Sequence, residues 1–226
     1  MTANKSPWIV VTDFDGTLTK KDVGNELCDV FASEQFRKLQ SEYRAGTITL
    51  KEYQLMMWTN FPCNEDNFRS EAARLGELRA GVNEFLEKCA AKKIPVYIAS
   101  CGIRPYIEEV LNSHVSEWAR SAIAGIMCND GEFDTKQMKK ILMPDNDPTG
   151  KTPLHKGLYA EELSKLHGGA KVLAVGNGSS DKSFVGHVEQ IAACDKFIDY
   201  CRGKNVECIK FEDFRDLYKK VPPGFW

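Results

Sequence analysis

Two aspartates, Asp13 and Asp15, lie two residues apart at the end of a short apolar run, residues 8–11, and Gly16 follows them. This run predicts a buried strand that delivers both acids to its carboxyl end, where ligands bind in open α/β sheets. Two neighbouring carboxylates in a dry site need a cation or a proton between them. The pair therefore indicates a Mg²⁺ site, or a nucleophile beside an acid with a raised pKa. An aspartate-rich turn that caps a helix is the plain alternative.

A second predicted strand, residues 94–99, runs directly into Ser100, Cys101 and Gly102. A small hydroxyl and a glycine at a strand-to-helix turn offer a donor and bare amides to a phosphate. Taken alone, a serine at this place is more often a helix N-cap. The segment is therefore a candidate phosphate-binding turn.

Two later segments add a cation, an amide and a third carboxylate. Lys156 begins a predicted helix, and a lysine among carboxylates would offset their charge and hold a phosphate, although Lys151 competes for this role. Glycines flank Asn177, so the backbone turns sharply there after a strand at 171–175. Asp181 lies one helical turn further on and can share a site with Asn177. A loop with a helix cap is the bland interpretation of this segment.

The remaining pattern predicts the elements that position these residues. Residues 20–78 have helical spacing, including a capping box from Thr49 to Glu52, and form a helical insert directly after the first strand. From about Gly81, helices and strands alternate, which predicts a doubly wound parallel sheet with helices on both faces. Asp130 and Gly131 are interpreted as a turn before a second extended piece at 138–143.

Composition narrows the class of protein. The chain has 226 residues, a net charge of −2 and a pI of about 6.1, so neither nucleic acid nor an anionic membrane is an expected partner. No apolar run reaches the roughly 18 residues that span a bilayer, and the first seven residues lack the apolar stretch of a secretory signal. A cytoplasmic protein is expected. Its eight cysteines include no C-x-x-C pair, so neither a zinc site nor disulfides are expected, and the oligomeric state stays open.

The order of the four segments along the chain is itself informative. A strand with Asp-x-Asp-Gly-Thr, a strand with Ser, a Lys, and a strand with Gly-Asn-Gly-x-x-Asp resemble the four motifs of the haloacid dehalogenase superfamily. The insert after the first motif resembles the small helical cap of its phosphoserine-phosphatase-like branch. Within this branch, the motif at 15–19 and the runs at 195–201 and 209–214 look most like the phosphatase of methylthioribose salvage, which acts on 2-hydroxy-3-keto-5-methylthiopentenyl 1-phosphate.

This resemblance implies a catalytic core at 1–19 and 79–226, a cap at 20–78, and hydrolysis of a small phosphorylated metabolite in methionine salvage or in phosphoserine and phospho-alcohol metabolism. It implies that Asp13 forms an aspartyl-phosphate and that Asp15 exchanges protons with the leaving group and water. It further implies a phosphate site and a Mg²⁺ site. The implied phosphate ligands are Ser100, Cys101, Gly102 and Lys156, and the implied metal ligands are Asp13, the Asp15 carbonyl, Asn177 and Asp181.

Asn177 departs from the family pattern, because the superfamily usually has an aspartate at this position. An amide oxygen can bind Mg²⁺ but carries no charge. Weaker metal binding is therefore expected. The chain is then either a phosphatase that needs more metal or a degenerate binder of a phosphorylated ligand. A sugar-phosphate mutase or phosphotransferase would use the same site.

Substrate choice is expected in the cap. The candidate contacts are Glu26, Arg44, Met56, Trp58 and Arg104, with Glu26 preferred because it follows the first motif closely. For each of them, a structural role in the cap core, at the surface or in a local ion pair is the more common one. The lone histidines His155 and His187 are interpreted as surface or satisfied core residues.

Overall fold

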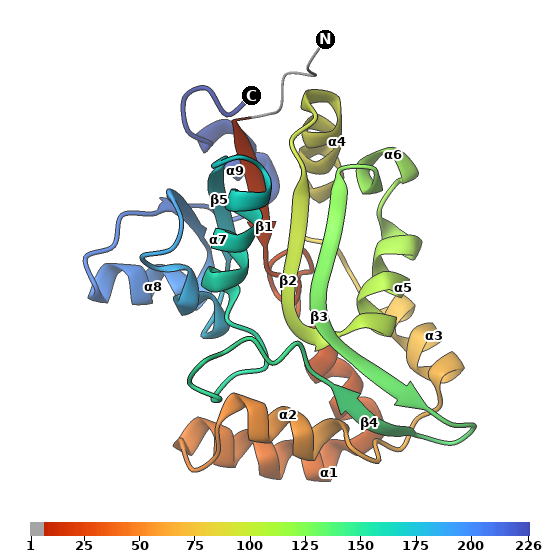
Figure 1. Cartoon of the computed structure of the whole chain (residues 1–226). Helices are drawn as coiled ribbons and strands as arrows, with labels where there is room; N and C mark the ends of the chain where they lie inside the picture. The colour runs from red at the N-terminus through yellow and green to blue at the C-terminus, as the bar shows by residue number, and fades with distance from the viewer. Residues whose placement is uncertain (1–6) are drawn as a thin grey trace.

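The computed structural model describes residues 7–226 (Figure 1). The prediction that the first seven residues form no secretory signal therefore falls almost entirely outside the described residues. Within this range, a seven-stranded sheet has the order β4-β3-β2-β1-β5-β6-β7. The strands are β1 (Trp8–Thr12), β2 (Val96–Ile103), β3 (Ile123–Phe133), β4 (Met138–Leu142), β5 (Lys171–Gly176), β6 (Gln190–Ala193) and β7 (Ile209–Lys210). All neighbouring strands are parallel except β3 and β4.

Helices cover both faces of this sheet, because the apolar residues of β1 point alternately to its two sides. Ile9 and Val11 pack in one core cluster with residues of the helices at 156–166 and 195–203. Trp8 and Val10 belong to the other cluster, with residues of the helices at 82–92, 104–114 and 214–220. The predicted α/β class, with helices on both faces, is confirmed. These helices are α4 (Val82–Lys92), α5 (Arg104–His114), α6 (Glu117–Arg120), α7 (Lys156–Leu166), α8 (Asp195–Gly203) and α9 (Phe214–Lys220), and a 3₁₀ helix, η1, spans Ser180–Phe184.

The segment after β1 is helical, as predicted. It contains α1 (Val23–Ala45), α2 (Leu50–Trp58) and α3 (Glu65–Leu75), and Figure 1 shows α1 and α2 beyond the end of the sheet at which β1 and β3 terminate. Thr49 and Glu52 make the predicted capping box at the start of α2. The chain enters and leaves this helical segment at adjacent positions, since Thr19 and Leu78 form an isolated antiparallel bridge. The division into a core and a cap domain itself stays a prediction.

One local expectation is corrected, and one strand was missed. Asp130 and Gly131 do not form a turn: they continue β3 and pair with β4, which runs antiparallel to it. The turn lies at 134–137, where the Asp134 carboxylate accepts hydrogen bonds from the amides of Lys136 (2.7 Å) and Gln137 (2.9 Å). The short strand β6 was not predicted. Among the described helices, none combines the length and apolar character needed to cross a membrane.

Candidate active site

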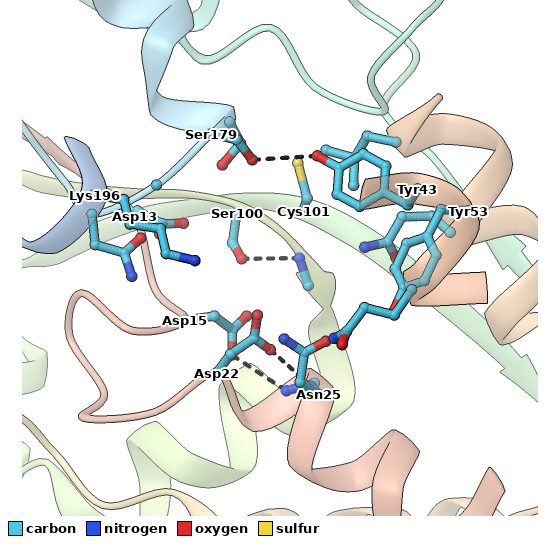
Figure 2. A pocket seen from close by; sticks show the side chains of 18 of the residues that line it. Asp13, Asp15, Asp22, Asn25, Tyr43, Tyr53, Ser100, Cys101, Ser179 and Lys196 are labelled. Carbon is cyan, nitrogen blue, oxygen red and sulfur yellow. Dashed lines mark hydrogen bonds between the residues drawn. The ribbon is translucent and has the colours of Figure 1, made fainter. Parts of the chain in front are cut away.

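A cleft of about 700 Å³ opens at the carboxyl ends of β1, β2 and β5 and reaches the helices α1 and α2. Its lining combines the Asp13 and Asp15 segment, residues 100–102 and residues 177–180 (Figure 2). These segments meet because parallel strands place their carboxyl ends at one edge of a sheet. The cleft is therefore the place where most of the predicted site residues come together.

Lys156 is the charged centre below this cleft. Its side chain is fully buried, and its Nζ donates to Asp13 Oδ1 and to Asp181 Oδ1, each at 2.7 Å. Burial alone would lower the pKa of Lys156, but the charges of Asp13 and Asp181 raise it. The lysine therefore stays charged. It begins α7, whose N-cap is His155; the ring of His155 accepts a hydrogen bond from the Leu158 amide.

The loop that precedes Asp181 holds its side chain in place. Its Oδ2 accepts hydrogen bonds from the amides of Asn177 and Gly178, both at 2.8 Å, and the residue is fully buried. A Cβ on Gly176 would lie 2.4 Å from the Asp181 Cγ, so only glycine allows this close approach. The predicted proximity of Asn177 and Asp181 is thus achieved through the backbone of Asn177.

The two acids of the first motif have raised pKa values. For Asp13, burial is the largest cause and the charge of Asp181 the next, while Lys156 opposes both. For Asp15, burial again comes first, followed by the charge of Asp22, which lies next to it in Figure 2. Asp13 also accepts a hydrogen bond from the Thr17 hydroxyl (3.2 Å), so its second oxygen has a partner as well.

The predicted phosphate-binding turn is built differently from the expectation. Residues 100–103 continue β2, with an irregular register against β3, and Ser100 is not an N-cap, because α5 begins after Ile103. The Ser100 hydroxyl accepts from the Gly102 amide (2.9 Å), so this amide is not bare. The side chain of Asn129 is fully buried and donates to the Cys101 carbonyl (2.6 Å), which helps to hold the segment against the cleft.

The oxygen atoms gathered here suit Mg²⁺. Across residues 7–226, no three His, Cys, Asp or Glu side chains form a ready metal-binding group. The implied ligand set is different, because it combines two carboxylates, Asp13 and Asp181, with the Asn177 amide oxygen and the Asp15 carbonyl. Hard oxygen ligands of this kind are those that Mg²⁺ prefers. The raised pKa values of Asp13 and Asp15 indicate that the site would gain from a further cation.

The expected substrate contacts divide into two groups. Arg44 and Trp58 line the cleft, whereas Glu26, Met56 and Arg104 do not. Glu26 contacts Lys21 (3.2 Å), and the Arg104 side chain contacts Asp130 (3.3 Å) and Glu108 (3.6 Å). For Arg104 this is the local ion pair that the sequence analysis favoured, whereas Glu26, the preferred substrate contact, pairs with Lys21 and does not line the cleft. His187 contacts Glu161 and does not line the cleft either.

Arg79 is a structural residue of the site that the sequence did not reveal. Its guanidinium donates to the Gly16 carbonyl (2.6 Å), the Thr17 carbonyl (3.2 Å) and the Asp195 carboxylate (2.7 Å). It thereby ties the loop after Asp13 and Asp15 to the start of α8, which also lines the cleft. A single arginine belongs to no sequence motif, and the one available signal was its position where the chain returns to the sheet.

Tyr43 and Tyr53 are two further residues of the cleft lining that the sequence did not reveal. Their rings stack with centroids 5.5 Å apart. Neither residue belongs to a motif that would have identified it.

Comparison with known proteins identifies the family. Residues 10–185 match the model of the haloacid dehalogenase-like hydrolases. The chain is 26% identical to the 2-hydroxy-3-keto-5-methylthiopentenyl-1-phosphate phosphatase of Microcystis aeruginosa, covering 92% of this chain and 95% of that protein. It is 24% identical to a polyol phosphate phosphatase of Saccharomyces cerevisiae, covering 92% and 90%.

The fold agrees with these matches. The solved phospho-aspartyl intermediate analogue of phosphoserine phosphatase superposes with a TM-score of 0.73 at 17% identity, covering 97% of this chain and all of that one. The predicted superfamily and the predicted enzyme class, a phosphatase, are confirmed, whereas the metal and the substrate stay predictions. The chain belongs to the haloacid dehalogenase-like hydrolase family.

Proposed function

We propose that this protein hydrolyses the phosphate monoester of a small metabolite through an aspartyl-phosphate on Asp13, with Mg²⁺ as its cofactor. The observation that carries this proposal is the buried Lys156, which bridges Asp13 and Asp181 at 2.7 Å below the cleft. A buried cation between two carboxylates is costly to build for stability alone. Together with a metal ion, such a cation supports a site that receives a further negative group.

The chemistry requires little beyond an aligned nucleophile and neutralised charge. A carboxylate oxygen of Asp13 bonds to phosphorus while the bond from phosphorus to the ester oxygen breaks, and Asp15 gives a proton to the departing oxygen. Asp15 then takes a proton from water, and the water oxygen attacks phosphorus. This second attack releases inorganic phosphate and restores the Asp13 carboxylate. Ser100 and Lys156 contribute to holding the phosphoryl oxygens.

Mg²⁺ would be held by Asp13, Asp181, the amide oxygen of Asn177 and the carbonyl of Asp15. When bound, it supplies positive charge next to the phosphoryl group. Both Asp13 and Asp181 are buried, and Lys156 is the buried cation beside them within the described residues. A divalent ion would balance the remaining negative charge.

The substrate we propose is the phosphate ester of a short, oxygen-rich carbon chain. Both named relatives, the methylthiopentenyl-phosphate enzyme and the polyol phosphate enzyme, carry a phosphate ester of this type in their names. The amide side chains of Asn25, Gln40 and Gln54 line the cleft and can bond to hydroxyl or keto oxygens. We place the reaction in the cytoplasm, with neither nucleic acid nor membrane as a partner.

Substitution of the nucleophile tests this function directly. Asp13→Asn keeps the size of the side chain but removes the attacking charge, so hydrolysis of 4-nitrophenyl phosphate with Mg²⁺ should fall by about a thousandfold or more. The wild type should also show a burst of 4-nitrophenol in rapid-mixing experiments. Asp199→Asn is the matched control, because Asp199 is exposed and pairs with Arg202. Equal activity of the two variants would exclude the mechanism.

A second candidate function is a binder of a phosphorylated ligand with little turnover. Asn177 favours it, because its amide lies where the family usually has a charged metal ligand. A Cβ on Gly16 would lie 2.1 Å from the Asn177 Nδ2, so the amide packs tightly against the catalytic loop.

Asn177→Asp separates the two candidates. Restoring the carboxylate adds a charge to the metal site, and a charge about 4 Å away is worth up to about 4 kcal/mol at an effective dielectric constant near 20. We expect the wild type to hydrolyse phosphate esters and the variant to reach half of its maximal rate at a lower Mg²⁺ concentration. If hydrolysis appears only in the variant, the native protein is the binder.

A further inference from the structure

The hydroxyl of Tyr106 lies beside the acid of the first motif. Tyr106 is on α5, close after the Ser100 segment, and is only 1% exposed. Its hydroxyl donates a hydrogen bond to Asp15 Oδ2. Its ring packs against Phe14 and Phe68, with centroids 6.2 and 6.0 Å away, so packing fixes the direction of the phenol.

Two glycines make room for this hydroxyl. A Cβ on Gly102 would lie 1.9 Å from the Tyr106 oxygen and 2.8 Å from Asp15 Oδ2, which no real side chain permits. A Cβ on Gly24 would approach the same hydroxyl to 3.2 Å. Gly102 was expected to present a bare amide to a phosphate. In the structure it instead leaves space for the contact between Tyr106 and Asp15.

The other oxygen of Asp15 is held from the opposite side. Asp15 Oδ1 accepts hydrogen bonds from the amides of Val23 (2.9 Å) and Gly24 (3.4 Å) at the start of α1. Hydrogen bonds from α1 therefore hold one oxygen of the carboxyl group, and a hydrogen bond from α5 holds the other. These bonds fix the orientation of the carboxyl group, and a fixed orientation of the reacting group contributes much of the rate enhancement of enzymes.

We propose that Tyr106 is a positioning residue, which holds the carboxyl group of Asp15 in the direction needed to give its proton to the leaving oxygen. This inference rests on the proposed function, because it assigns that proton to Asp15. Its test uses the step in which the leaving group departs, because kcat/KM reports this step and not the later attack of water. An alkyl phosphate releases a strongly basic alkoxide and depends on the proton, whereas 4-nitrophenolate is stable enough to leave without one.

The test is Tyr106→Phe, which keeps the packed ring and removes one hydroxyl. We expect kcat/KM for glycerol phosphate to fall by about tenfold or more, a fraction of the full effect of general acid catalysis, and kcat/KM for 4-nitrophenyl phosphate to stay within about threefold. Inhibition by inorganic phosphate should stay within about twofold, because the hydrogen bond of the hydroxyl is made to Asp15 and not to the phosphate segment. Tyr97→Phe is the matched control, since its hydroxyl contacts His167 at 2.7 Å and does not line the cleft.

The outcomes are distinct. Selective loss on the alkyl ester, seen in Tyr106→Phe and not in Tyr97→Phe, supports the positioning role. Equal loss on both esters, no loss on either, or a joint loss of activity, phosphate inhibition and melting temperature overturns it. A wild-type protein that hydrolyses neither ester overturns the proposed function itself, so the two failures are told apart.

Discussion

Among single residues, Lys156 stands out because its charged side chain is fully buried between two carboxylates. An ammonium group without solvent contact is stable only because two carboxylates lie 2.7 Å away, and each of them depends on it in return. In the sequence, Lys151 competed with Lys156 for this role, and only the family resemblance selected Lys156. The structure gives the physical reason, because Lys156 is the buried first residue of α7 whereas Lys151 is exposed in the preceding loop.

Lys156→Met should therefore destabilise the fold strongly. The variant leaves Asp13 and Asp181 buried and facing each other without a cation, and breaking a buried pair in this way typically costs about 3–5 kcal/mol. Urea unfolding at neutral pH without metal measures this free energy. Lys151→Met is the control and should change it by less than about 0.5 kcal/mol, as is usual for an exposed position. A loss for Lys156→Met as small as that of the control would contradict the assigned charge balance.

At the scale of elements, the loop between β4 and α7 decides where Lys156 lies. Asp147 organises this loop: its carboxylate accepts hydrogen bonds from the amides and hydroxyls of Thr149 and Thr152 at 2.8–2.9 Å. The Lys151 carbonyl of the same loop accepts from the Lys51 amide of α2 (3.0 Å). The loop thus connects the inserted helices to the helix that carries the buried cation.

The stability contribution of Asp147 should depend on pH. Burial opposes ionisation, but the hydrogen bonds from Thr149 and Thr152 outweigh it and lower the pKa of Asp147. A lowered pKa in the folded state gives stability that is complete above the unfolded pKa of about 3.9 and is lost as pH falls toward the folded value. Asp147→Asn should thus cost about 1–3 kcal/mol at pH 7, the usual cost of leaving buried hydrogen-bonding groups without a partner.

Denaturant unfolding at several pH values checks this dependence. The difference between wild type and Asp147→Asn should shrink below about pH 4, where the unfolded chain begins to bind a proton. Asp145→Asn is the control in the same loop: Asp145 is exposed and pairs with Lys51, so its effect should stay below about 1 kcal/mol. A difference for Asp147→Asn that is constant between pH 7 and pH 3 would show that its carboxylate is not stabilised by the fold.

At the scale of the whole molecule, the site exists because distant segments of the chain end at one edge of a sheet. β1 lies at the centre, between β2 and β5. Asp13 and Asn177 directly follow β1 and β5, and Ser100 lies in the carboxyl-terminal half of β2. The inserted helices then lie beyond that edge and form the opposite wall of the cleft. Sequence order alone predicts such a convergence, because parallel strands require it.

The sequence by itself determined the fold class, the family and the order of the four motifs, because apolar runs, glycines and acids at strand ends are local features of the chain. It could not determine that Arg79 and Tyr106 support the catalytic loop, since each is an isolated residue whose partners are distant in sequence. It favoured a local ion pair for Arg104 without naming its partners, and it preferred Glu26 as a substrate contact, because the partners of both charges are selected by packing. Tertiary structure decided these points, since hydrogen bonds and ion pairs between elements depend on distances that no local pattern contains.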